Sequence, residues 1–350
     1  MFPYIILIAL VLILYVLSQG SVLNNNQSPT REKCTNKHLL TIGYIFVTIF
    51  SAIRYDVGWD YMQYYNTIVY GLNTNMMSNN EYLTIFLINI SRNLNFPFLY
   101  FALNSAISVY FIAKVINRYS KNPWLSLLIY ICFPLFYLNS FSVIRMFTAL
   151  AITTYAFRYV LEKKLFKYSL CIILASMFHA SALFSLVLYL SSYIRVKTST
   201  LTIIVMALPL ISNIINSIVI NYTRYGVYTN QTRVQEGTRA IVVILVIFII
   251  SMLLRKRISK DYNLNIIFNS YTIGLMIYLM FLRQGTMGHR LSLYGTIFMI
   301  ILVPNMLAYF HIKSRIILTY GLVCAYIFMY LWTIMNGATY IPYNTVFDLV

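Results

Sequence analysis

The chain has 350 residues, of which 60 % are hydrophobic, 17 % aromatic and 10 % charged, and its formal net charge is +18. A soluble domain of this length carries roughly a quarter charged residues, so the composition excludes a soluble enzyme. The Lys and Arg residues lie in short clusters between apolar runs, where membrane orientation explains them better than nucleic acid does. We predict an all-α polytopic membrane protein with a single transmembrane domain over residues 1–350.

Apolar stretches that approach or reach the roughly 20 residues of a membrane-crossing helix recur along the whole chain. The first of them, 2–18, lacks the preceding basic residues and the small-residue cleavage site of a secretion signal, so we interpret it as a retained span. The other predicted spans are 38–53, 96–115, 123–139, 141–160, 201–220, 240–254, 262–282, 291–310 and 315–335. With shorter apolar pieces at 82–92, 168–178 and 180–194, roughly 10–14 helices are expected, some of them re-entrant or broken.

Basic clusters between these spans set the expected orientation. The strongest is "RKRISK" at 255–260, and Lys and Arg in short loops stay on the cytoplasmic side. With that loop inside, the other basic clusters also lie inside, and 168–194 becomes a hairpin that enters from the inside and breaks near His179. The remaining polar residues then fall at the outer face, where 82–92 lies along the surface. Outward-facing arginines oppose the usual charge bias, so an anionic ligand outside would explain them.

Two of the eight acidic residues occur four positions apart in "SAIRYDVGWDYMQYYN", 51–66, where an apolar helix ends. Asp60 precedes Gln63 by three positions, so a capping box that starts a short helix is one explanation for it. Asp56 has no such structural reason and suits a general base, because burial and the neighbouring Arg54 would set its proton affinity. The alternative for Asp56 is an ion pair with Arg54 or a distant arginine.

The same stretch contains candidate substrate contacts. Gly58 permits a tight turn or the close approach of another group to the backbone. Tyr61 and Tyr64 share one face of the short helix expected after Asp60, and aromatic rings in this region can stack on sugars.

Three further positions carry charge or an imidazole inside apolar surroundings. Arg145 lies just inside a predicted span, where a buried guanidinium needs an anion or several acceptors; a ligand phosphate or Asp56 or Asp60 would serve. In "RQGTMGHR", 283–290, Arg283 and Arg290 flank a glycine-containing turn that also includes His289. These three residues suit a phosphate clamp. His179 is either a hydrogen-bonded core residue or a functional group at a helix break.

Several kinds of site leave no trace in the sequence. The chain has no HExxH, no paired Cys-x-x-Cys, no phosphate-binding glycine loop, no GxSxG elbow and no dinucleotide fingerprint. The four cysteines are scattered and suit apolar packing. We therefore predict neither a metal nor a cofactor.

Five motifs, in order along the chain, resemble those of the EpsG-type, Wzy-like polysaccharide polymerases. In that family an R-x-x-V-G-T-D-Y-x-x-Y stretch follows an early span, as in "RYDVGWDYMQYY". Trp59 replaces the usual Thr, and Met146 replaces the usual Gln of the second motif, but no charged group is lost. The five segments are "SAIRYDVGWDYMQYYN", "NSFSVIRMFTALAI", "LASMFHASALF", "GHRLSLYGTIFMIILVP" and "GATYIPYNTVF".

The resemblance implies a membrane glycosyltransferase that joins oligosaccharide repeat units carried on undecaprenyl pyrophosphate, at the outer face of a bacterial cytoplasmic membrane. The product would be O-antigen, capsule or exopolysaccharide, and a flippase and a chain-length regulator are the implied partners. The expected reaction is an inverting, metal-independent displacement in which arginines stabilise the departing pyrophosphate. The predicted catalytic residues are Asp56, Asp60, Arg145 and His179, and the predicted substrate-binding residues are Arg54, Gly58, Tyr61, Tyr64, Arg283, His289 and Arg290.

Two other function classes share some of these features. A flippase for lipid-linked oligosaccharide would also have cavity-facing arginines, but it should show an internal repeat, and this chain has none. A polysaccharide ligase uses the same kind of donor, and the sequence separates it poorly from a polymerase. An acyltransferase would carry an early His-Asp or Arg-His signature, which is absent.

Overall fold

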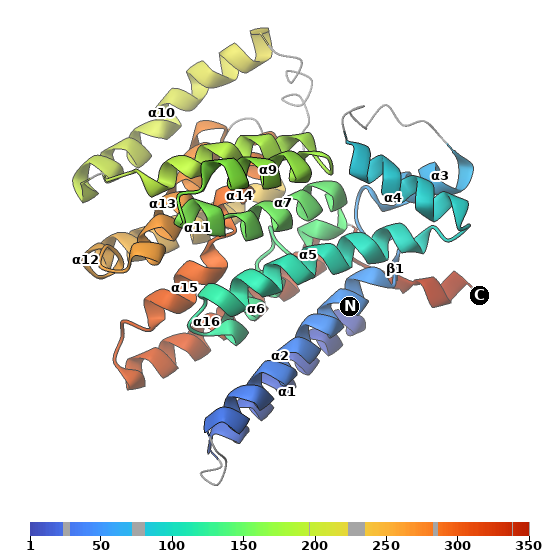
Figure 1. Cartoon of the computed structure of the whole chain (residues 1–350), viewed down its shortest axis with the longest axis horizontal. Helices are drawn as coiled ribbons and strands as arrows, with labels where there is room; N and C mark the ends of the chain where they lie inside the picture. Colours follow the sequence, from blue (N-terminus) through green and yellow to red (C-terminus); the bar gives the residue numbers. More distant parts are fainter. Residues whose placement is uncertain are drawn as a thin grey trace. The chain divides into compact units, whose positions relative to one another are not determined.

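The computed structural model describes residues 1–23, 29–71, 81–195, 197–222, 235–282, 286–337 and 339–349. These residues form sixteen α-helices, short 3-10 helices and two short strands, so the chain is an all-α polytopic membrane protein as predicted (Figure 1). It divides into two compact units. Unit 1 comprises Met1–Ala151, Met177–Ala180 and Ile316–Val350, and unit 2 comprises Ile152–Ser176 and Ser181–Arg315. The expected single domain remains a prediction.

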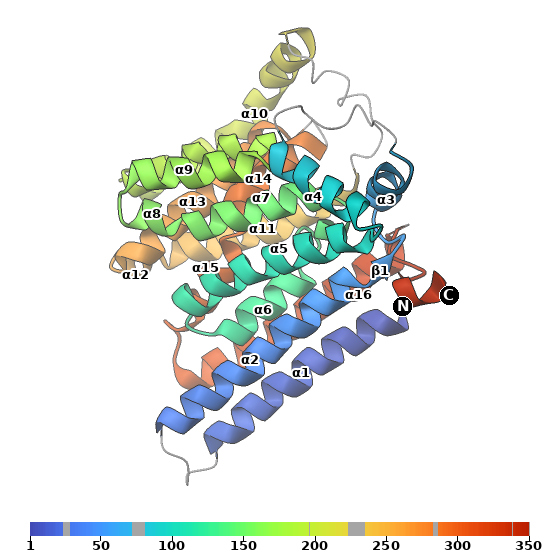
Figure 2. The ribbon, with the colours of Figure 1, turned by 45° about the vertical axis from the view of Figure 1, so that its right-hand side comes forward.

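Unit 1 is built on long apolar helices. In both Figure 1 and Figure 2, α1 runs along α2, which also packs against α5. The helices of unit 1 are α1 (Phe2–Leu23), α2 (Pro29–Ala52), α3 (Tyr61–Tyr70), α4 (Tyr82–Asn93), α5 (Phe98–Tyr119), α6 (Pro123–Cys132), η1 (Asn139–Phe141), the first part of α7 (Ile144–Ala156), most of α16 (Ile312–Asn336) and η4 (Val346–Leu349).

A two-stranded antiparallel ladder joins an early loop of unit 1 to its C-terminal end. Strand β1 (Arg54–Tyr55) pairs with β2 (Asn344–Thr345), so that Arg54 lies opposite Thr345. The Val346 N–H extends the contact by donating to the Ile53 carbonyl at 2.9 Å. The first and the last of the five motifs are therefore in direct contact.

Three described helices are each long and apolar enough to cross a bilayer: Phe2–Gln19, Phe98–Tyr119 and Ile312–Asn336. A fourth span is formed if Gly288–Thr296 and Met299–Leu307, which meet at 43°, count as one broken helix. Among the described residues, the other predicted crossings fall short of either the length or the apolar content that a span needs. The predicted span 123–139, for example, is helical only as far as Cys132, because Pro134 forces the preceding Phe133 into an extended conformation with ψ 125°.

Unit 2 contains the remaining helices. These are the end of α7, α8 (Arg158–Leu161), α9 (Leu165–Ser176), η2 (Ala180–Ser192), α10 (Thr198–Tyr222), α11 (Gln235–Leu253), α12 (Arg255–Ile258), α13 (Tyr262–Met280), α14 (Thr286–Thr296) and α15 (Met299–Leu307). The closest packing is between α13 and α14, where a Cβ on Gly274 would lie 2.5 Å from the Thr296 nitrogen. Only glycine allows the two backbones to approach so closely.

The predicted hairpin at 168–194 has the expected interruption. Helix α9 ends at Ser176, residues Met177 to His179 are not helical, and η2 begins at Ala180. The interruption is fixed to the start of α4 within unit 1, because the Leu83 N–H donates to the Met177 carbonyl at 3.0 Å and the Thr84 hydroxyl donates to the Phe178 carbonyl at 2.8 Å. His179 is therefore held by its neighbours' backbone groups.

Candidate active site

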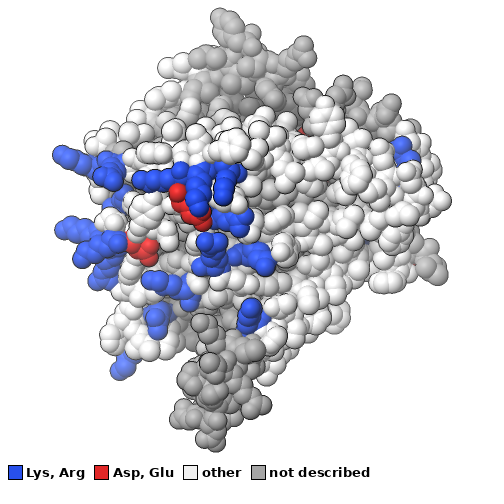
Figure 3. Space-filling view, viewed as in Figure 1, with Lys and Arg blue, Asp and Glu red and all other residues white. Residues whose placement is uncertain are grey.

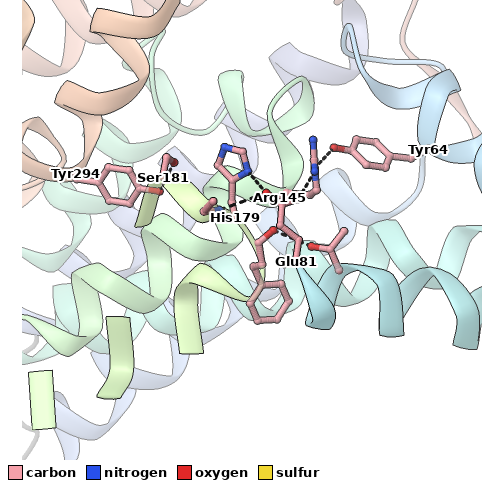
Figure 4. Close-up of polar contacts among 9 residues, drawn as sticks. Tyr64, Glu81, Arg145, His179, Ser181 and Tyr294 are labelled. Carbon is pink, nitrogen blue, oxygen red and sulfur yellow. Dashed lines mark hydrogen bonds and ion pairs between the residues drawn. The ribbon is translucent and has the colours of Figure 1, made fainter. Parts of the chain in front are cut away.

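Glu81 is at the centre of a buried polar cluster in unit 1. It immediately precedes α4, and its side chain is only 2 % exposed. One carboxylate oxygen, Oε2, accepts from Nη1 of Arg145 on α7. The other, Oε1, is 2.8 Å from Nδ1 of His179 and accepts from the Ala180 N–H at 3.2 Å (Figure 4). Two predicted catalytic residues from separate motifs thus meet on one carboxylate.

The charge state of Glu81 fixes the roles of the His179 ring nitrogens. Burial raises the pKa of the Glu81 carboxyl, but the hydrogen bond from His179 and the charge of Arg145 together lower that pKa below its usual value. An ionised carboxylate only accepts hydrogen bonds, so Nδ1 of His179 must be the donor. In the neutral imidazole, Nε2 is then unprotonated and available as a proton acceptor. The His179 side chain is 26 % exposed, so that acceptor can reach a ligand.

Arg145 is held from a second side by Tyr64 of α3. Its Nε donates to the Tyr64 hydroxyl, and its guanidinium carbon lies 5.6 Å from the centre of the Tyr64 ring. The pKa of Tyr64 is raised to about 12: burial raises it most, the Arg145 charge lowers it, and the Asp60 carboxylate raises it. Asp60 is therefore within electrostatic range of the cluster through Tyr64.

Helix α7, which carries Arg145, is attached to α5 by buried polar groups. The Thr148 hydroxyl donates to Oδ1 of Asn104 at 2.7 Å, and Nδ2 of Asn104 donates to the Tyr100 carbonyl at 2.8 Å. The Tyr100 ring stacks on Tyr64 with 5.2 Å between ring centres. Arg145 is thus positioned by a rigid, hydrogen-bonded contact between two helices.

The loop between β1 and α3 is attached to the segment that precedes Arg145. Gly58 is buried with φ 104°, and a Cβ there would lie 2.3 Å from the Phe141 carbonyl oxygen. The next residue, Trp59, donates its N–H to the Ser142 hydroxyl at 3.1 Å. Gly58 therefore serves close packing of two backbones, which is one of the two structural roles that the sequence suggested, and its predicted contact with substrate stays a prediction.

Asp60 lies at the start of α3, but the expected capping box is wrong. Its side chain makes no capping hydrogen bond, because its backbone is helical, with φ −94° and ψ −1°, whereas a capping side chain needs an extended residue. Tyr61, the first residue of α3, is fully buried and stacks on Phe101 with 3.9 Å between ring centres. Its ring faces the protein core.

Arg54 lies in a different setting from Arg145. It is 1 % exposed, donates to the Ser51 carbonyl, and its guanidinium carbon lies 4.6 Å from the centre of the Phe141 ring. Its Nε has no hydrogen-bond partner among the described residues. The adjoining cavity, lined by Asn104 and Tyr137 among others, measures about 10 Å³, which suits a water molecule and is far too small for a diphosphate.

Asp56 is on the surface of unit 1. Its side chain is exposed and its backbone is left-handed, with φ 51°. Arg54, two positions earlier, is buried in an aromatic cage formed by the rings of Tyr61, Phe101 and Phe141. The described residues show no ion pair between Arg54 and Asp56. The structure therefore places Asp56 apart from the contacts that join Glu81, Arg145 and His179.

The residues of the fourth motif belong to unit 2. His289 and Arg290 lie in the first half of α14 and are partly buried, and Arg283 is outside the described residues. On the same helix, the hydroxyl of Tyr294 lies 2.9 Å from that of Ser181, the second residue of η2. The phosphate clamp expected from 283–290 remains a prediction.

Glu81 is the functional residue that the sequence analysis missed. It follows a polar stretch that resembles an ordinary loop, and its partners lie 64 and 98 positions away. The available signal was a glutamate immediately before an apolar helix in a chain with only eight acidic residues. A carboxylate there must be paired if it is buried, and the sequence left the partners of Arg145 and His179 open.

No group of three or more His, Cys, Asp or Glu side chains suited to a metal occurs among the described residues. The Glu81 cluster itself offers one carboxylate and one imidazole, with a guanidinium beside them.

Comparisons with known proteins agree with the five motifs. No curated protein and no solved structure matches the chain. The EpsG family model matches residues 37–345, which include β1, Glu81, α7, the His179 interruption, α14 and β2. By this match over most of its length, the chain belongs to the EpsG family, a family of membrane proteins in polysaccharide biosynthesis.

Proposed function

We propose that this protein is a glycosyltransferase that polymerises oligosaccharide repeat units carried on undecaprenyl pyrophosphate, at the outer face of a bacterial cytoplasmic membrane. The family and the motif resemblance support the substrate class. The observation that carries a catalytic role is the contact of Glu81 with both Arg145 and His179 in unit 1. It provides a carboxylate, an imidazole and a guanidinium at one partly accessible place.

In this proposal, His179 is the general base. Glu81 accepts a hydrogen bond from the Nδ1–H group, which fixes the tautomer and leaves Nε2 to take the proton from an acceptor-sugar hydroxyl as the hydroxyl attacks the anomeric carbon. As Nε2 gains that proton, the imidazolium is stabilised by the adjacent carboxylate. The carbon–oxygen bond to pyrophosphate breaks at the same time, so direct displacement inverts the anomeric centre.

Arg145 has two consequences for this chemistry. Its positive charge keeps Glu81 ionised, which the base needs. It also adds positive potential where a pyrophosphate would leave, a role that a metal ion fills in many other transferases. Asp56 and Asp60, which the sequence predicts as catalytic, have in this proposal the role of acceptor-side contacts, since one is exposed and the other lies beside Tyr64.

Reconstitution in proteoliposomes tests this function. Purified protein supplied with a lipid-linked repeat unit should give a ladder of polymer lengths with EDTA present, and the His179→Gln variant should polymerise at least about 100-fold more slowly. His38→Gln is the matched control, because His38 is exposed on α2 and remote in sequence from all five motifs. Movement of the unit across the bilayer without polymer would identify a flippase, and transfer only to a non-carrier acceptor would identify a ligase.

A further inference from the structure

A pocket in unit 2 lies outside the candidate active site. It measures about 430 Å³ and is lined by residues from the end of α11, from α12 and from the turn that follows α15. This volume is in the range of pockets that hold small ligands. The lining residues are Leu253, Leu254, Lys256, Arg257, Tyr309, Phe310 and His311.

The pocket has two chemically different parts. Leu253, Leu254 and Phe310 form an apolar part that continues the apolar surface of α11, and the Leu253 side chain is 80 % exposed. Lys256 and Arg257 supply cations beside it, and both are exposed. A ligand that fits both parts has an anionic head and an apolar body.

The three consecutive cations of α12 have different roles. Arg255 is directed toward α13, since its Nη1 donates to Oδ1 of Asn265 and its guanidinium carbon lies 4.7 Å from the centre of the Phe268 ring. Arg257 stabilises the opposite side of the pocket, because it donates a hydrogen bond to the Tyr309 carbonyl at 2.5 Å. Lys256 makes no comparable contact with the residues that the structure describes, so its ammonium group is available to a ligand.

Little negative charge opposes these cations. The segments 253–261 and 309–315 together contain six Lys or Arg residues and His311, with Asp261 as their single acidic residue. Asp261 caps α13 by accepting the Leu264 N–H at 3.0 Å. On the face in Figure 3, Lys and Arg gather over the end of unit 2 that carries α12, with few acidic side chains among them.

We propose that this pocket binds an anionic phospholipid from the cytoplasmic leaflet, with the phosphate between Lys256 and Arg257 and an acyl chain along Leu253, Leu254 and Phe310. The basic loop 255–260 is expected on the cytoplasmic side, where Lys and Arg attract anionic headgroups. The proposal does not rest on the polymerisation reaction, because Glu81, Arg145 and His179 are not among the residues that line the pocket.

Binding of a fluorescent phosphatidylglycerol to the purified full chain in detergent, with a phosphatidylcholine analogue as reference, tests the proposal. Phosphatidylglycerol should bind at least tenfold more tightly than phosphatidylcholine, and Lys256→Gln with Arg257→Gln should weaken it roughly tenfold or more. Lys256→Gln alone should also weaken phosphatidylglycerol binding, but by less. Because this variant leaves the hydrogen bond of Arg257 to Tyr309 intact, its loss of affinity reports on ligand binding and not on the structure of the pocket. Millimolar inorganic phosphate should not displace the lipid.

The matched control is Lys163→Gln with Lys167→Gln, which removes the same charge from exposed residues of unit 2 that do not line the pocket. This control should bind phosphatidylglycerol like the unchanged protein. The proposal is overturned if the control loses as much affinity as the pocket variant, if the pocket variant binds normally, or if inorganic phosphate competes as well as the lipid does.

Discussion

Arg54 and Arg145 have similar sequence surroundings but different environments in unit 1. Arg54 is packed among aromatic rings beside a cavity of about 10 Å³, and no carboxylate pairs with it among the described residues. Arg145 is 11 % exposed and bound to Glu81, which also holds His179. A charged residue in an apolar chain therefore indicates a site only when its partners and its access to ligand are known.

The largest expected difference is in activity between Arg145→Met and Arg54→Met. Arg145→Met leaves the Glu81 carboxylate buried without its cation, so polymerisation should fall at least about 100-fold. Arg54→Met keeps a side chain of similar bulk among the aromatic rings that surround Arg54, so kcat and KM should stay within about threefold of the values of the unchanged protein. Rates on a lipid-linked repeat unit, compared at equal amounts of folded protein, check both. A large rise in KM for Arg54→Met would show that Arg54 contacts substrate.

The loop between β1 and α3, which packs against the segment before Arg145, should be sensitive to one added methyl group. Gly58→Ala places a Cβ against the Phe141 carbonyl at a residue with φ 104°, so it should destabilise the protein by about 3 kcal/mol. Gly71→Ala is the matched control: it has φ 67°, but no atom of the described part of the chain lies within 4 Å of the added Cβ, so it should cost only about 1 kcal/mol. Thermal unfolding in detergent measures both. Equal losses would contradict the packing role of Gly58.

The acid sensitivity of the Glu81 cluster gives a third test. Because the pKa of Glu81 is lowered from 4.5 in the folded protein, its ionised form stabilises the fold above pH 4.5, and that contribution is lost as the pH falls through the lowered pKa. Glu81→Gln should therefore reduce the unfolding temperature clearly at pH 7 and much less in strong acid. A constant difference across this range would show that the carboxylate charge contributes nothing.

The smallest effect is expected at an exposed ion pair. Lys164 Nζ lies 2.8 Å from Glu162 Oε2, and these side chains are 51 % and 36 % exposed. Water screens such a pair, so Glu162→Gln should change the free energy of unfolding by less than about 0.5 kcal/mol and leave activity unchanged. Chemical denaturation of this variant beside Glu81→Gln checks the contrast. A comparable loss from both would remove the distinction between buried and exposed pairs.

Local patterns of the sequence predicted much of the fold. Apolar runs identified the helical membrane class, and the helix interruption at His179 was expected from two half-length apolar pieces. The ladder between Arg54 and Thr345 was not predicted, because strands of two residues leave no periodic pattern. Pro134 explains why one predicted span ends early, which apolar content alone did not reveal.

The candidate site was predicted in part. Arg145 and His179 were named from the sequence, and the structure brings both to one carboxylate. Glu81 was missed because pairing over such a separation is decided by tertiary packing, here by the attachment of 177–178 to the start of α4. Asp56 was favoured for its position beside an arginine, whereas the structure shows the two side chains in different environments.

The most direct test of the central claim is a double-mutant cycle on the polymerisation rate with Glu81→Gln, His179→Gln and the double variant. If Glu81 acts by orienting the His179 imidazole and stabilising its imidazolium form, the double variant should be no slower than His179→Gln alone, because residues that work as a unit are not additive. Full activity of Glu81→Gln, or a double variant slowed by the product of the two single effects, would contradict the Glu81–His179 base.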